Sequence, residues 1–136
     1  MYVLRDKNFF LGYYWCGEFG NPDIPEEFEW VKIISPLHNI PTNPKIYPAI
    51  LVTTADHDDR VVPAHSFKYA ATLQEMYKGN NPVLIRIETN SGHGASNVTK
   101  NIEVLSDIYS FIFYNMGLKP EFSNLYKGDA EKKKPF

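Results

Sequence analysis

Residues 49–63 read AILVTTADHDDRVVP and combine three signals of local structure. Ala49–Thr54 is a continuous apolar and β-branched run, which is typical of a strand covered on both faces in a parallel sheet. The acidic residues after it predict a polar turn, and Pro63 favours the start of a helix because its φ angle suits a first-turn position. The stretch therefore predicts a buried strand, a polar turn at its carboxyl end and a helix that follows.

Apolar spacing along the rest of the chain predicts further elements on both sides of this stretch. One helix starts at Pro25 and ends near Ile34, and the helix from Pro63 ends near Lys78. A second strand is predicted at Val83–Glu88. The last helix runs from about Thr99 to Met116, with Gly117 as its C-cap. Residues 1–24 mix aromatic residues and glycines without a clear period and predict a loop-rich entry segment.

The helices are expected to turn their regularly spaced apolar residues toward a core. His65, in a first helical turn, is expected to be solvated. The residues expected to face inward are Phe28, Val31, Ile34, Phe67, Ala70, Leu73, Tyr77, Ile102, Leu105, Ile108, Tyr109, Ile112 and Phe113.

The order helix, strand, helix, strand, helix implies an α/β fold in which a right-handed crossover joins two parallel strands. The polar segments after the two strands then lie at the same edge of the sheet, where open α/β sheets place their functional sites. The search for chemistry therefore concentrates on residues 55–63 and 91–94.

Composition narrows the classes of function. The 136 residues are 43% hydrophobic and 15% aromatic, which fits one globular domain. A formal net charge of −2 gives no reason to expect a nucleic acid or an anionic membrane as partner, and no run of about 20 apolar residues is present. The single cysteine, Cys16, excludes an internal disulfide framework and agrees with a reducing compartment, so a cytoplasmic location is expected.

Asp58 and His93 are the candidate catalytic residues. Asp58 follows the first strand, and His93 stands between two glycines 35 positions later. A histidine base needs a carboxylate on its Nδ1 side, and the order acid then histidine is that of the α/β-hydrolase triad. Spacing does not choose between Asp58 and its neighbours Asp56 and Asp59.

Each candidate residue can also be explained without a catalytic role. The aspartates could form a solvated turn or cap the next helix, and His93 could be a surface loop residue. Arg60 could bind a substrate carbonyl or pair with a neighbouring aspartate. Three aromatic residues could line an apolar pocket or belong to the core: Tyr14, Trp15 and Phe19. Asp56-His57-Asp58 lacks a further cluster of metal ligands, so neither a metal nor another cofactor is expected.

Four ordered motifs resemble the C-terminal end of the prolyl oligopeptidase family, serine peptidase family S9. They are Trp15–Gly20 (WCGEFG), Ser35–Asn39 (SPLHN), Thr54–Pro63 (TADHDDRVVP) and Gly92–Gly94 (GHG). The similarity covers nearly all of residues 8–118. It implies that residues 1–120 form the C-terminal part of an α/β-hydrolase catalytic domain with an incomplete sheet, and that residues 121–136 form a tail.

The resemblance also implies a role for individual residues. Asp58 would be the triad acid and His93 the triad base, while Arg60 would donate to a substrate carbonyl near the scissile proline. Val61 and Trp15 would line the pocket that accepts proline. Phe19 stands where the family usually has tyrosine, which keeps an apolar wall but removes a hydroxyl.

The nucleophile is absent from these 136 residues, because no serine lies in a Gly-x-Ser-x-Gly segment. The first hypothesis is therefore a C-terminal fragment of a serine-type endopeptidase that cleaves after proline in short peptides. Its partners would be a proline-containing peptide and the missing N-terminal part of the catalytic domain with its propeller, and the chain alone would be inactive. The alternatives are a non-catalytic module that only binds and a fragment of an α/β-hydrolase acting on esters.

Overall fold

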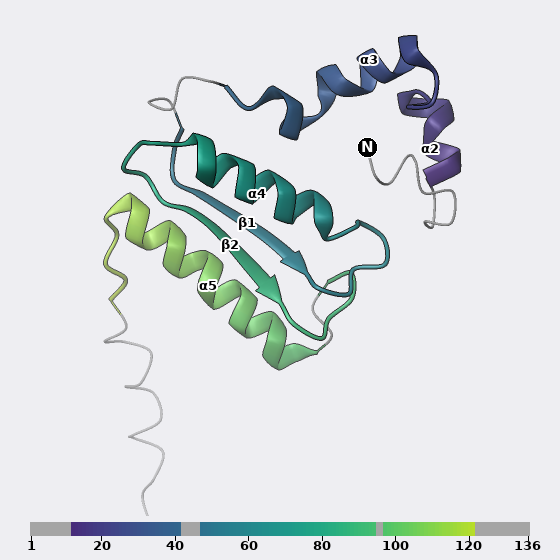
Figure 1. Cartoon of the computed structure of the whole chain (residues 1–136). Helices are drawn as coiled ribbons and strands as arrows, with labels where there is room; N and C mark the ends of the chain where they lie inside the picture. The colour runs from purple at the N-terminus through teal and green to yellow at the C-terminus, as the bar shows by residue number, and fades with distance from the viewer. Residues whose placement is uncertain (1–11, 42–46, 95–96, 122–136) are drawn as a thin grey trace, which may run out of the picture.

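The computed structural model describes residues 12–41, 47–94 and 97–121. Two helices and a short 3₁₀ turn precede the sheet, and each strand is followed by a helix (Figure 1). The elements are α2 (Gly12–Phe19), α3 (Pro25–Ile34), η1 (Pro36–Asn39), β1 (Ile50–Ala55), α4 (Ala64–Met76), β2 (Val83–Glu88) and α5 (Val98–Met116).

The sheet of the described residues has two parallel strands. Ile50 pairs with Val83 at one end, and Ala55 pairs with Glu88 at the other. Both strands therefore end at the same level, and the segments after them start side by side. The predicted parallel pair and the α/β class are confirmed, with the second strand at its expected bounds.

Helix α4 covers one face of the sheet and carries the most buried side chains of the described residues. Leu73 is fully buried and Ala70 is 2% exposed. The Gln74 side chain donates a 2.8 Å hydrogen bond to the carbonyl of Val83, which ties the helix to the start of β2. Phe67 was expected inside as well, but it is exposed, so the buried stripe is narrower than predicted.

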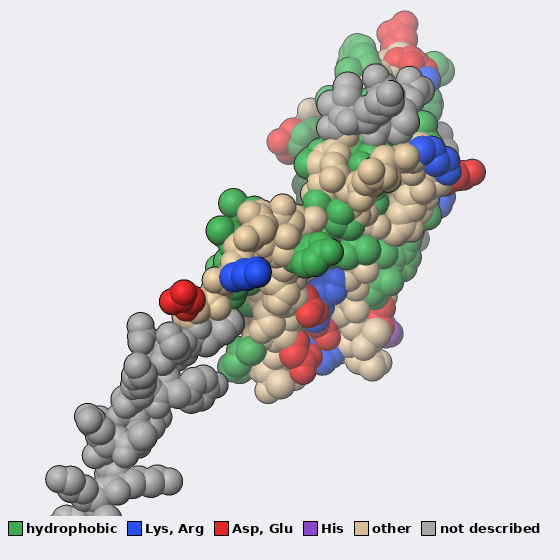
Figure 2. All heavy atoms as spheres, turned by 90° about the vertical axis from the view of Figure 1, so that its left-hand side faces the viewer, with side chains coloured by type: hydrophobic (Ala, Val, Ile, Leu, Met, Phe, Trp, Pro, Cys, Tyr) green, Lys and Arg blue, Asp and Glu red, His purple; other side chains and the backbone are tan. Residues whose placement is uncertain are grey.

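Helix α5 flanks the sheet on the other side, so that the strands run between α4 and α5 (Figure 1). The predicted inward packing of Ile102, Leu105 and Tyr109 is wrong, because these side chains are 59%, 51% and 53% exposed. Ile108 and Ile112, which were also predicted to face inward, do lie toward β1. Hydrophobic side chains also reach the surface on the face shown in Figure 2. An open hollow of about 310 Å³ between β1 and α5 is lined by Leu51, Thr53, Ile108, Phe111 and Ile112.

The expected loop-rich entry segment is wrong for residues 12–19, which form α2. Two helical turns are too short for mixed aromatic residues and glycines to show a period. Gly20 follows the helix with a φ of 105°, and its amide donates to the carbonyl of Cys16. A positive φ favours glycine because it has no Cβ.

Two smaller corrections concern burial, and one helix end is as predicted. Ile34 was expected to face a core but is exposed, whereas Val31 on the same helix is buried. His65 is half-buried and not solvated, because the first turn of α4 lies against other residues. Gly117 caps α5 as expected, with a left-handed φ of 67°. Of the predicted tail at residues 121–136, all but residue 121 lies outside the described part of the chain. No described helix is long and apolar enough to cross a membrane.

Candidate active site

Two loops at the carboxyl ends of the strands carry the candidate catalytic residues. The first loop follows Ala55 and the second follows Glu88, and these two residues are paired in the sheet. The loops continue the contact, because the Asp56 amide donates to the carbonyl of Glu88 and the His57 amide donates to the carbonyl of Ser91 (both 3.0 Å). The parallel register thus brings residues 35 positions apart to one edge.

Asp58 and His93 lie within hydrogen-bond distance of each other across the two loops. The Nδ1 atom of His93 is 3.0 Å from Oδ2 of Asp58 and 3.1 Å from its Oδ1. The same Oδ1 accepts hydrogen bonds from the backbone amides of Arg60 (2.9 Å) and Val61 (2.8 Å). The loop's own amides therefore orient the carboxylate, and His93 Nδ1–H can donate to this oriented acceptor.

The surroundings of Asp58 keep it ionised. Its side chain is 11% exposed, whereas that of His93 is 45% exposed. Burial raises the pKa of Asp58, but the hydrogen bonds from the Val61 amide, the His93 ring and the Arg60 amide outweigh it and hold the pKa below its ordinary value. An ionised, mostly buried carboxylate beside an accessible imidazole can stabilise the imidazolium ion that forms when histidine takes a proton.

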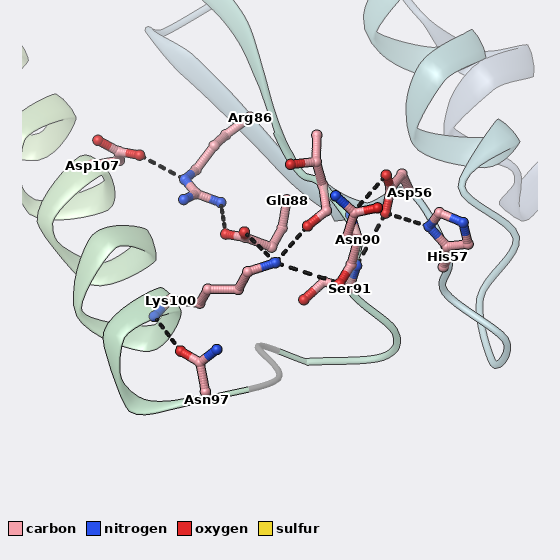
Figure 3. Close-up of polar contacts among 10 residues, drawn as sticks. Asp56, His57, Arg86, Glu88, Asn90, Ser91, Asn97, Lys100 and Asp107 are labelled. Atoms are coloured by element: carbon pink, nitrogen blue, oxygen red, sulfur yellow. Dashed lines mark hydrogen bonds and ion pairs between the residues drawn. The ribbon is translucent and has the colours of Figure 1, made fainter.

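Asp56 has a different environment, although it belongs to the same turn. One of its oxygens lies 2.7 Å from Nδ1 of His57 and also accepts from the amide of Ser91 (3.2 Å), and the other accepts from the amide of Asn90 (2.9 Å) (Figure 3). The hydrogen bond from His57, followed by that from Asn90, lowers the pKa of Asp56 strongly. Asp56 therefore binds the backbone of the second loop, and Asp59 is exposed. Contact with His93 distinguishes Asp58 from both.

A charged network behind the second loop was not anticipated from the sequence. Arg86 contacts Glu88 (Nη1 to Oε2, 2.8 Å) and Asp107 (Nε to Oδ2, 2.7 Å), and Lys100 Nζ lies 3.4 Å from the other oxygen of Glu88 (Figure 3). Arg86 lowers the pKa of Glu88, with a smaller contribution from Lys100. Two charged residues in an otherwise apolar strand were the signal that could have indicated such a network.

The residues expected to bind substrate lie in two places. Arg60 and Val61 are exposed in the loop after β1, next to the carboxylate that their amides hold. Trp15 is half-buried and Phe19 is exposed on α2, which stands beside α3 and apart from that loop (Figure 1). The structure therefore brings the first two residues to the Asp58–His93 pair but not the two aromatic residues. The described residues contain no cluster of three or more metal-ligating side chains.

Comparison with known proteins gives a consistent set of relatives. The model of the prolyl oligopeptidase family matches residues 1–119. The prolyl endopeptidase of Elizabethkingia miricola is 48% identical over 119 residues, which are 86% of this chain and 17% of that protein. Prolyl oligopeptidase B from Galerina marginata, solved as an alanine variant of one serine with a 35-residue hydrolysis and macrocyclization substrate, is 41% identical and superposes with a TM-score of 0.74.

Oligopeptidase B from Trypanosoma brucei, solved with covalently bound antipain, has a similar backbone but a more distant sequence. It superposes with a TM-score of 0.77 at 25% identity, over 90% of this chain and 17% of that one. The match to the Galerina structure covers 87% of this chain and likewise 17% of the other. The chain thus spans about a sixth of the length of the relatives that it matches.

Proposed function

The chain belongs to the prolyl oligopeptidase family, and we propose that Asp58 and His93 are the acid and base of a serine-type peptidase that cleaves peptides after proline. The observation that carries this proposal is the contact of 3.0 Å between His93 Nδ1 and Asp58 Oδ2. The two amides that hold Asp58 support it further, because they orient the carboxylate without help from His93.

The chemistry follows from the arrangement of the imidazole. With Nδ1–H donating to Asp58, Nε2 carries the lone pair that accepts the proton of a serine hydroxyl. The serine oxygen then attacks the carbonyl carbon of the scissile bond, and the protonated His93 returns the proton to the departing amine. Water, deprotonated by the same nitrogen, releases the acyl group from the serine.

Arg60, Val61, Trp15 and Phe19 are proposed to bind the substrate. Arg60 follows the acid, and its guanidinium can donate to a carbonyl of the peptide. Val61 offers an apolar surface next to it. Trp15 and Phe19 would complete the proline pocket through α2 once the remainder of the catalytic domain fixes that helix against the loops.

The serine is proposed to come from a part of the peptidase outside these 136 residues. No Gly-x-Ser-x-Gly segment is present here, and the matched relatives are about six times longer. The partner that completes the site is therefore the rest of a catalytic domain, with its propeller, and the substrate is a short proline-containing peptide.

A chimera tests this function. The 119-residue matching segment of the Elizabethkingia prolyl endopeptidase is replaced by the corresponding residues of this chain, and hydrolysis of a chromogenic proline amide is measured. We expect activity in the chimera and none in the chain alone. Asp58→Asn and His93→Ala should each lower kcat by about 10³-fold or more. Asp58→Asn no longer holds His93 in the required tautomer, and His93→Ala removes the base itself.

Asp59→Asn is the matched control, since Asp59 is an exposed neighbour of Asp58. It should leave the rate close to that of the unmodified chimera. A folded chimera that binds the peptide but does not cleave it would favour a module that only binds. Activity that survives His93→Ala would contradict the proposed base.

A further inference from the structure

We infer that Asp56 and Lys100 are positioning residues that hold His93 against Asp58 through the backbone of Thr89–Ser91. This inference rests on the proposed role of His93 as the base. Neither side chain contacts His93 in a hydrogen bond of the described residues. They act on the segment directly before it, from opposite sides (Figure 3).

Asp56 binds the amide side of this segment. Its carboxylate accepts hydrogen bonds from the amides of Asn90 (2.9 Å) and Ser91 (3.2 Å). The carboxylate is the stronger type of acceptor because it is ionised. The His57 amide adds a 3.0 Å bond to the carbonyl of Ser91. The end of β1 therefore fixes Ser91, which is 2% exposed and lies two residues before His93.

Lys100 binds the carbonyl side. Its Nζ donates to the carbonyls of Thr89 (2.5 Å) and Asn90 (3.4 Å) and lies 3.4 Å from a carboxylate oxygen of Glu88. Lys100 stands in the first turn of α5, which has no acidic residue. A cation there is unfavourable for the helix because the N-terminal end carries partial positive charge. The contacts to the loop, and not the helix dipole, therefore stabilise the lysine at this position.

Asn90 shows why the segment needs binding from both sides. Among the described residues it is the one non-glycine residue with a positive φ, 52°, a conformation that is uncommon for residues with a Cβ. Its amide is held by Asp56 and its carbonyl by Lys100. Only Gly92 separates Ser91 from His93, so a shift of the backbone at Asn90 or Ser91 displaces the imidazole as well.

The tautomer of His93 tests the inference. In the ¹⁵N-labelled 136-residue chain, long-range ¹H–¹⁵N spectra at about pH 8.5, where an ordinary imidazole is neutral, report which ring nitrogen carries the proton. We expect Nδ1–H to dominate in the unmodified chain and to lose its preference in Asp58→Asn. Lys100→Met and Asp56→Asn should each lower the ratio of Nδ1–H to Nε2–H at least twofold, and Lys100→Arg should restore it.

Asp59→Asn and Asp107→Asn are the controls, because each removes a nearby carboxylate that makes no contact with Thr89–Ser91 in the described structure. They should leave the tautomer ratio unchanged. If Asp58→Asn shifts the ratio but Lys100→Met does not, the inference is overturned and the proposed function stands. If the dispersed spectrum of the unmodified chain shows no Nδ1–H preference, the Asp58–His93 pair itself fails. Lys100→Met decides the matter even where Asp56→Asn does not fold.

Discussion

The two helices that flank the sheet differ in how much of their apolar surface is covered. On α4, Leu73 and Ala70 are buried, and the helix is tied to β2 by Gln74. On α5, which is longer and also rich in apolar residues, no residue is buried. Its firmest links to the sheet are charged, through Asp107 and Lys100. One side of the sheet is therefore held by packing and the other by polar contacts.

This difference bears on how the candidate site is held. The loop after β2 leads into the loosely packed α5, and a backbone carbonyl of this loop accepts a hydrogen bond from Lys100 of that helix. Asp58, by contrast, is held within its own loop, which leads into the well-packed α4. The acid is therefore fixed locally, whereas the base depends on contacts between separate elements.

The largest loss of stability is expected from truncating a buried side chain of α4. Leu73→Ala should lower the free energy of unfolding by about 3 kcal/mol, because it removes buried methyl groups and leaves a cavity. The matched change on the other helix, Leu105→Ala, should alter it by less than about 0.5 kcal/mol, because that side chain is half in solvent. Urea denaturation of both variants measures the difference. Equal effects would mean that α5 is covered as well as α4.

A smaller loss of stability is expected when the charged contacts between the sheet and α5 are removed. Arg86→Met should lower the free energy of unfolding by about 2 kcal/mol, since Glu88 and Asp107 both lose a charged donor. Lys32→Met is the control, because the pair of Lys32 and Glu29 is solvated, 3.5 Å apart and within one helix; its loss should stay below about 0.5 kcal/mol. Similar values for the two variants in urea denaturation would show that the network contributes no more than a surface pair.

Local signals account for what the sequence predicted well. The β-branched runs marked both strands, and Gly117 marked the end of α5, because backbone conformation at these positions depends on the residues themselves. Part of the inward face of α5 was predicted wrongly, for a different reason. Apolar spacing shows that a helix has something to bury, but not whether the rest of the fold covers it, and Ile102 and Leu105 remain exposed.

The candidate site shows the same division. The order of Asp58 and His93 was readable, but the choice among three aspartates of one turn was not. It depends on which amides and which imidazole face each carboxylate, and this is set by the register between β1 and β2. The role of Lys100 could not be predicted either, because it binds backbone carbonyls, which have no signature in the sequence.

The smallest effect is expected from acidification, which separates the contribution of His65 from that of the carboxylates by pH. Burial lowers the pKa of His65 at the start of α4. As pH falls below about 6.5, this histidine is therefore protonated in the unfolded chain before it is protonated in the folded chain. Stability is lost from that pH down to the lower pKa of the folded state. The lowered pKa values of Asp56, Asp58 and Glu88 act later, because their stabilisation is lost only as pH falls below about 4. His65→Gln should remove the first loss and leave the second, whereas His38→Gln, at an exposed position, should keep both. The urea midpoints of the three proteins, measured from pH 7.5 to 3.5, test this expectation. If the curves of the unmodified chain and of His65→Gln run parallel above pH 5, His65 titrates as a solvated residue and the expectation is wrong.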